Sequence, residues 1–103
     1  MSLNYIVAGD YGQIIILTVL DSDTNAAADI STYDTSIQLQ FRDPGRKKEL
    51  KNAVFVSDGT DGKIKYTLTT GDIDEAGSWA VRAIVQSGTA KLSTEWAPFS
   101  VLD

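Results

Sequence analysis

The stretch DIDEAGSWAVRAIV, residues 72–85, decides the fold class of this chain. From Trp79 onward, an apolar residue returns at every second position, and a period of two is typical of a β-strand with one face in a core. The inward face of this strand is predicted to consist of Trp79, Val81, Ala83 and Val85. The opposite face is mixed, because Arg82 lies between Ala80 and Ile84.

The same alternation returns elsewhere, and a helical period does not. TSIQLQF at 35–41 and KIKYTLT at 63–69 both place apolar residues on one face and polar residues on the other. No window of a dozen residues keeps an apolar stripe at the period of 3.6 that an amphipathic helix needs. The predicted inward residues are Ile37, Leu39 and Phe41 in the first stretch and Ile64, Tyr66 and Leu68 in the second. We therefore expect an all-β fold.

Seven stretches qualify as strands, and residues that favour turns separate them. One of them, QIIILTVL, contains the longest apolar run of the chain and is predicted to be a buried strand. Strands at this spacing are typical of an Ig-like antiparallel β-sandwich with Greek-key connections, formed by residues 1–103 as a single domain. The seven stretches are 4–8, 13–20, 35–41, 53–56, 63–69, 78–85 and 91–101.

The residues before the strand at 78–85 predict a structural corner. Ig domains have a Tyr two residues before their second Cys, and its hydroxyl binds backbone a few residues upstream. The segment EAGSWAV at 75–81 resembles this signature, with Trp79 in the place of the Tyr and Val81 in the place of the Cys. We expect Glu75 to cap the corner, Gly77 to permit the turn, and Val81 to fill the position between the sheets without a disulfide.

Composition excludes several classes of function. The chain of 103 residues has no cysteine, so disulfides and thiolate chemistry are excluded. Its net charge of −5 disfavours nucleic acid and anionic lipid as partners. The longest apolar run is too short to cross a bilayer, and the first residues lack the basic start and apolar stretch of a secretory signal. Neither a membrane nor a nucleic acid is expected to be a partner.

Three longer segments resemble small Ig-like proteins of tailed bacteriophages and prophages, including the amino-terminal domains of phage baseplate upper proteins. They are GDYGQIIILTVLDSD at 9–23, IQLQFRDPG at 37–45 and DGTDGKIKYTLTTGDIDEAGSWAVRAIV at 58–85. The resemblance implies a noncatalytic role in a tail or baseplate, with other tail proteins or further copies of the chain as partners. It also implies a place in the virion after assembly in the host bacterial cytoplasm.

The sequence contains no set of residues for a reaction. It has no His, no Cys and no G-x-S-x-G, so nucleophilic and zinc chemistry lack their components. The neighbouring acids Asp72, Asp74 and Glu75 are expected to cap backbone amides rather than to form the acid pair of a glycosidase. We expect no catalytic residue and no cofactor.

Two acidic segments resemble calcium-binding loops only in part. DSDTN at 21–25 has the alternate oxygens that open an EF-hand loop, but the sixth and twelfth loop positions are Ala26 and Thr32 instead of Gly and Glu. DGTDG at 58–62 fits a hairpin turn. Both are predicted to be turns without a metal. The basic cluster RKKELK at 46–51 is predicted to be a solvated loop, with a contact to an acidic protein surface as the alternative.

The carboxyl-terminal run supplies the predicted interface. Pro98 cannot donate to a sheet ladder, so this strand is expected at an edge or with a bulge. Trp96 and Phe99 are of the kind that dominates protein interfaces. We therefore predict a protein interface at Trp96, Pro98 and Phe99. The alternative is a carbohydrate-binding or adhesion module in which Trp96 stacks on a sugar ring.

Overall fold

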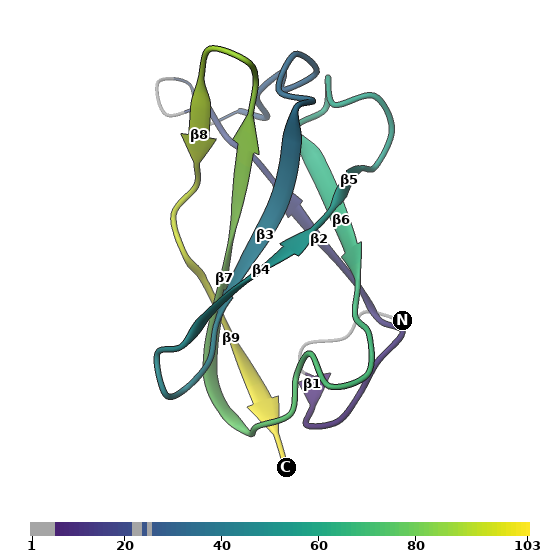
Figure 1. Ribbon diagram of the computed structural model, residues 1–103, viewed down its shortest axis with the longest axis vertical. Coiled ribbons are helices and arrows are strands. Elements are labelled where there is room, and N and C mark those ends of the chain that lie inside the picture. The colour runs from purple at the N-terminus through teal and green to yellow at the C-terminus, as the bar shows by residue number, and fades with distance from the viewer. Residues whose placement is uncertain (1–5, 22–23, 25) are drawn as a thin grey trace.

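The computed structural model describes residues 6–21, 24 and 26–103, and among them are nine β-strands and no helix (Figure 1). The predicted all-β class is confirmed, with two more strands than expected. The strands are β1 (Ile6–Val7), β2 (Ile14–Thr18), β3 (Ser36–Arg42), β4 (Lys48–Asn52), β5 (Val54–Phe55), β6 (Lys63–Thr67), β7 (Gly77–Gln86), β8 (Lys91–Ser93) and β9 (Ala97–Leu102).

The strands form two sheets. The larger sheet has the order β1-β9-β7-β3-β4, with β8 also paired to β7, and the smaller sheet has the order β2-β6-β5. Every pair of strands is antiparallel except β1 and β9, which run parallel. The expectation of a wholly antiparallel fold is therefore wrong for the larger sheet. Strands that run parallel cannot be joined by a hairpin, and here nearly the whole chain lies between the two.

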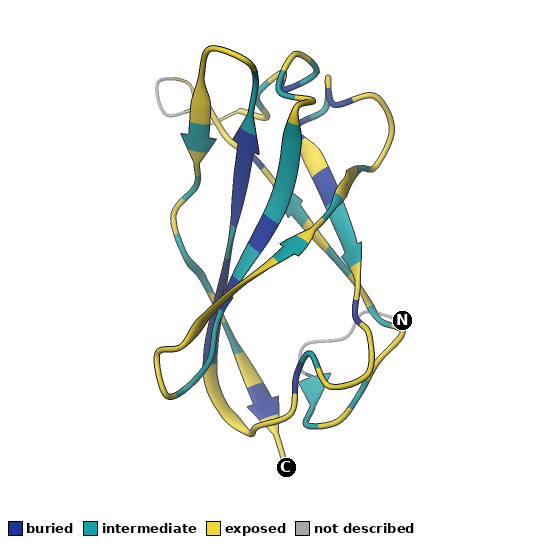
Figure 2. Cartoon of the chain, viewed as in Figure 1, coloured by how far each residue is buried: buried dark blue, intermediate teal, exposed yellow. Residues whose placement is uncertain are grey.

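The predicted inward faces are confirmed in the centre of the larger sheet. Strands β3 and β7 pair over seven residues, from Ser36 opposite Gln86 to Arg42 opposite Ala80. This register places the predicted inward residues of both strands on the same side, where Leu39 and Val85 are fully buried. Figure 2 shows the burial concentrated along β7.

One core joins the two sheets. It includes Leu39 and Phe41 from the larger sheet and Ile64 from the smaller one. The rings of Phe41 and Tyr66 lie 5.9 Å apart across the space between the sheets. The core also takes in Ile30 and Ile73, which lie outside the strands. Apolar residues in these connections therefore close the space between the sheets.

The basic cluster is a strand rather than a loop. Residues 48–52 form β4, and all five of them pair with β3. The prediction of a solvated loop at 46–51 is wrong for this part. Strand β4 has a neighbour on one side only, and most of its side chains are exposed, so it has no apolar alternation to reveal it.

The long apolar run near the start is not buried. Strand β2 lies at an edge of the smaller sheet, and its side chains alternate between half-buried and exposed. Ile14 and Ile16 are 57% and 53% exposed. The prediction of a buried strand is wrong because no part of the described chain covers the outer face of this sheet.

The carboxyl-terminal run divides into two strands, β8 and β9, that both pair with β7. Between them, Thr94 replaces regular pairing: its Oγ1 accepts a hydrogen bond from the Ala83 amide at 2.9 Å, and its own amide donates to the Ala83 oxygen at 3.0 Å. The edge position predicted for β9 is wrong, because β1 follows it in the sheet order. Pro98 is nevertheless tolerated, since β1 pairs only with Val101 and Leu102.

Candidate functional site

The predicted corner is centred on Trp79. Its side chain is 5% exposed, and its indole Nε1 donates a hydrogen bond to the backbone oxygen of Glu75 at 2.8 Å. The ring also stacks on Phe99, with centroids 6.2 Å apart. Glu75 thus contributes its backbone oxygen to the corner. Glu75 itself is an exposed residue.

Two further corner residues have separate structural roles. Gly77 adopts φ 135°, and a Cβ at this position would lie 2.8 Å from Cγ of Pro44. The position therefore favours glycine both for its backbone conformation and for space. Val81 is buried and pairs with Phe41 on one side and with Ala97 on the other. The contacts of Trp79, Gly77 and Val81 and the backbone oxygen of Glu75 thus serve the fold.

Asp72, beside this corner, connects three parts of the chain. Its carboxylate lies 3.1 Å from the ammonium of Lys51 and accepts hydrogen bonds from the Tyr66 hydroxyl at 2.5 Å and from the Thr69 amide at 2.8 Å. Only 6% of the Asp72 side chain is exposed. The carboxylate caps a backbone amide, as predicted for the acids of this segment, and also ties β4 to β6.

These contacts shift the ionisation of all three groups. Burial alone would raise the pKa of Asp72, but the hydrogen bonds from Tyr66, Thr69 and Lys51 outweigh it and lower that pKa. The Asp72 carboxylate raises the pKa of Lys51. Burial, followed by the hydrogen bond to Asp72, raises the pKa of Tyr66. All three shifts preserve the charged pair and the neutral phenol, which is the behaviour of a structural cluster.

The three residues of the predicted interface do not lie together. Phe99 is half-buried and packs against the core: its ring is nearly perpendicular to that of Phe41, with centroids 6.5 Å apart, and it stacks on Trp79. Pro98 is exposed on the other side of β9. Trp96 precedes the strand and is half-buried. Phe99 is therefore a core residue, and only Trp96 and Pro98 remain accessible to a partner.

Trp96 lies in a cationic cluster on the larger sheet. The guanidinium carbons of Arg42 and Arg82 lie 4.5 and 4.6 Å from the centroid of its ring, and the ammonium of Lys48 lies 6.0 Å away. These distances are in the range of cation–π attraction. Arg82 is further held by Gln40, whose Oε1 accepts a hydrogen bond from its Nε at 2.8 Å.

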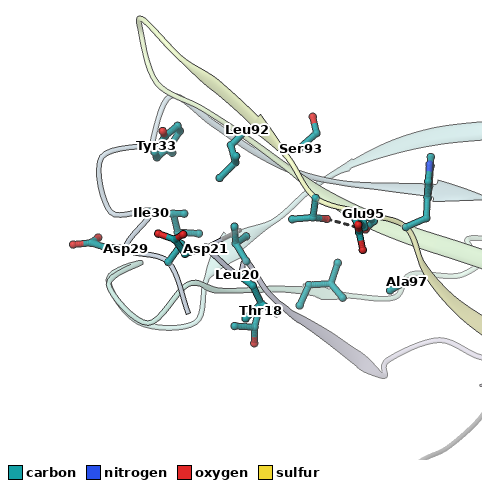
Figure 3. Close-up of a pocket in the computed structure, with 15 residues that line it drawn as sticks. Thr18, Leu20, Asp21, Asp29, Ile30, Tyr33, Leu92, Ser93, Glu95 and Ala97 are labelled. Carbon is teal, nitrogen blue, oxygen red and sulfur yellow. Dashed lines mark hydrogen bonds between the residues drawn. The ribbon is translucent and has the colours of Figure 1, made fainter. Parts of the chain in front are cut away.

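A groove of about 1140 Å³ opens beside Trp96, between β2 and the run from β8 to β9 (Figure 3). Leu92 points into the space toward Ile30, whereas Ser93 points away from it. The groove is lined by apolar Leu17, Val19, Leu20, Ala28, Ile30, Leu92 and Ala97, by the aromatic residues Tyr33 and Trp96, and by polar Thr18, Asp21, Asp29, Ser93, Thr94 and Glu95. Apolar and polar residues thus both line the groove, and three of the polar ones are acidic.

The acidic loops form turns where the structure describes them. The Asp58 carboxylate accepts hydrogen bonds from the amide and hydroxyl of Thr60 at 3.0 and 2.6 Å, and Asp61 accepts one from the Lys63 amide at 3.1 Å. In the other loop, Asp23 and Asn25 lie outside the described residues. Within residues 6–21, 24 and 26–103, no three His, Cys, Asp or Glu side chains gather as a metal would require.

Comparison with protein-family models and with curated proteins finds no match to this chain. The part of the chain that the structure describes contains no helix that is long and apolar enough to cross a membrane.

Proposed function

We propose that this chain is a noncatalytic Ig-like module of a bacteriophage or prophage tail or baseplate that acts through protein contacts. The resemblance of the segments at 9–23, 37–45 and 58–85 to Ig-like phage proteins supports the tail role. In this proposal the partners are other tail proteins, and the chain is part of the virion after assembly in the host cytoplasm.

The strand connections and the corner support the Ig-like part of the proposal. Successive strands β2 and β3 belong to different sheets, and so do β6 and β7, as in a Greek-key β-sandwich. The hydrogen bond from Trp79 to the Glu75 backbone matches the role that a Tyr hydroxyl has in the corner of Ig domains.

The observation that favours protein contact over sugar binding is the environment of the Trp96 ring. A sugar that stacks on an indole needs a free aromatic face, but two guanidinium groups lie within 4.6 Å of the centroid of this ring. Arginine beside tryptophan is instead the composition that protein interfaces favour. Lys48 adds a further positive charge at the same place, so an acidic protein surface fits best.

The groove favours a second candidate, a carbohydrate-binding or adhesion module. The residues that line it include the acidic Asp29 and Glu95 and the aromatic Tyr33 and Trp96. Hydroxyl and carboxylate groups around an aromatic residue are suited to the hydroxyl groups of a sugar. In this alternative the sugar contacts the groove, and the arginines leave the ring when the sugar binds.

One set of variants separates the two functions. We expect Trp96→Ala to weaken association with tail proteins encoded beside this chain while the urea-unfolding midpoint changes little. Tyr11→Ala, which truncates an aromatic residue that is 65% exposed and lies outside the groove and the cationic cluster, is the matched control. Sedimentation velocity of the mixed proteins, with a glycan array in parallel, reports both functions. Sugar binding that depends on Trp96, with no protein association, would replace the proposed function by the second candidate.

A further inference from the structure

Strand β2 presents a free edge of backbone groups. It is the outermost strand of the smaller sheet, and among the described residues no strand lies on its other side. Val19 donates to Gly62, and Leu68 donates to Gln13, so the odd-numbered residues of this segment direct their N–H and C=O groups toward β6. In an antiparallel ladder the intervening residues then direct theirs outward. The outward residues are Ile14, Ile16 and Thr18.

This edge lacks the features by which proteins prevent unwanted strand pairing. Charged residues and proline are the usual protection of an edge, and β2, with the sequence IIILT, contains neither. Strand β4, an edge of the larger sheet, contains two lysines and a glutamate in five residues. Beyond Thr18, the Ala28 amide donates to the oxygen of Val19, an odd-numbered residue, so this bond does not involve the outward backbone groups of β2.

We propose that β2 pairs with β2 of a second copy of the chain, antiparallel and around a two-fold axis. The outward backbone groups meet when Ile16 lies opposite Ile16 of the second copy and Ile14 lies opposite Thr18. On the inner side, the same register places Ile15 opposite Leu17. All five residues of the strand then pair, and every side chain in the contact is apolar except that of Thr18.

Charge and shape both fit a second copy. The nearest positive charges, on Lys63 and Lys65, belong to β6. Two β6 strands would lie three strand spacings apart, or about 14 Å, which is beyond the Debye length of about 8 Å at physiological salt. Leu17 lines the groove between the sheets, so the inner side chains of the second copy would reach the mouth of that groove. The contact therefore buries apolar surface without opposing like charges.

This inference goes beyond the proposed function, because the pairing does not depend on a role in a phage tail. Sedimentation equilibrium over a range of concentrations tests it. We expect the wild type to show a monomer–dimer equilibrium and Ile16→Lys to raise the dissociation constant at least about tenfold. The register places two lysines opposite each other in that variant, and like charges so placed repel. Val54→Lys is the matched control, because Val54 is 56% exposed and belongs to the same cross-strand row, but on β5.

A charge-swap mixture makes the test specific. Ile16→Glu alone should also be monomeric, whereas a mixture of Ile16→Lys and Ile16→Glu should dimerise, since the register places the two charges opposite each other. A monomeric wild type, or equal loss in Val54→Lys and Ile16→Lys, would overturn the inference. A monomeric wild type that still binds tail proteins would leave the proposed function intact. A dimer that binds no tail protein would support the inference and count against the tail role.

Discussion

The indole nitrogen of Trp79 donates a hydrogen bond to the backbone oxygen of Glu75, four residues upstream, at 2.8 Å. One side chain thereby joins the connection before β7 to the core, because the same ring stacks on Phe99. The corner depends on an apolar ring with a polar tip rather than on a particular residue type at Glu75.

Trp79→Ala should lower the free energy of unfolding by about 3 to 5 kcal/mol, because it removes a large buried ring. Trp79→Phe keeps part of the ring and loses the hydrogen bond, so we expect a smaller loss of about 1 to 3 kcal/mol. Ser78→Ala, at an exposed neighbouring position, should cost under about 1 kcal/mol. Urea unfolding measures all three, and equal losses for Trp79→Ala and Ser78→Ala would contradict the buried corner.

Gly77→Ala should destabilise the fold by about 1 to 3 kcal/mol, because the residue has φ 135° and its new Cβ would meet Pro44 at 2.8 Å. Gly88→Ala is the control, since a Cβ there meets nothing within 4 Å. Thermal unfolding of the two variants compares them directly. A Gly77→Ala variant as stable as Gly88→Ala would show that the turn adapts without strain.

Asp72→Asn should remove a pH-dependent part of the stability. The folded-state pKa of Asp72 is lowered, so its contribution is present above the unfolded pKa of about 3.9 and is lost as the pH falls through the folded value. We therefore expect the wild type to exceed Asp72→Asn in unfolding free energy by about 1 to 3 kcal/mol between pH 5 and 8. The difference should shrink below about pH 4.

At alkaline pH, the unfolding free energy of the wild type depends on Lys51 and Tyr66, whose pKa values are raised in the fold. Their contribution is complete below the unfolded pKa values of about 10 and is lost as the pH rises through the folded ones. Urea unfolding of the wild type and of Asp72→Asn across the pH range measures the loss of stability at both acidic and alkaline pH. A constant difference from pH 2 to 8 would mean that the Asp72 carboxylate is not the stabilising group.

Calcium should leave the melting temperature unchanged. Asp58 and Asp61 already accept hydrogen bonds within their own turn. A metal that bound only the folded chain would raise its stability by linkage. Thermal unfolding in millimolar calcium and in excess chelator makes the comparison, and a rise of several degrees with calcium would revive a site in one of the two acidic loops.

The strands with one buried face could be predicted from the sequence. Alternation is the direct consequence of a core on one side, and it correctly identified the inward residues of β3, β6 and β7. It failed at β4, where neither face is buried enough to require apolar residues. It also failed at β2, because an apolar run does not reveal whether its outer face is covered.

The surroundings of Trp96 could not be predicted in the same way. Arg42 and Arg82 lie 40 residues apart in the chain and come together only through the pairing of β3 with β7. The only trace in the sequence is that each lies on the face of its strand opposite the predicted inward face. The prediction of Phe99 as an interface residue rests on the preference of interfaces for aromatic residues, whereas its alternation with Ala97 and Val101 places it on the inward face of β9.

The central claim is that the chain works by binding other proteins, and co-purification tests it most directly. The chain would be co-expressed with the proteins encoded beside it, and size-exclusion chromatography with light scattering would give the mass of each complex. We predict a complex of defined stoichiometry that Trp96→Ala weakens and that Tyr11→Ala, at an exposed aromatic residue outside the site, leaves intact. A chain that forms a complex with none of these proteins, and that binds a sugar through Trp96 instead, would contradict the account.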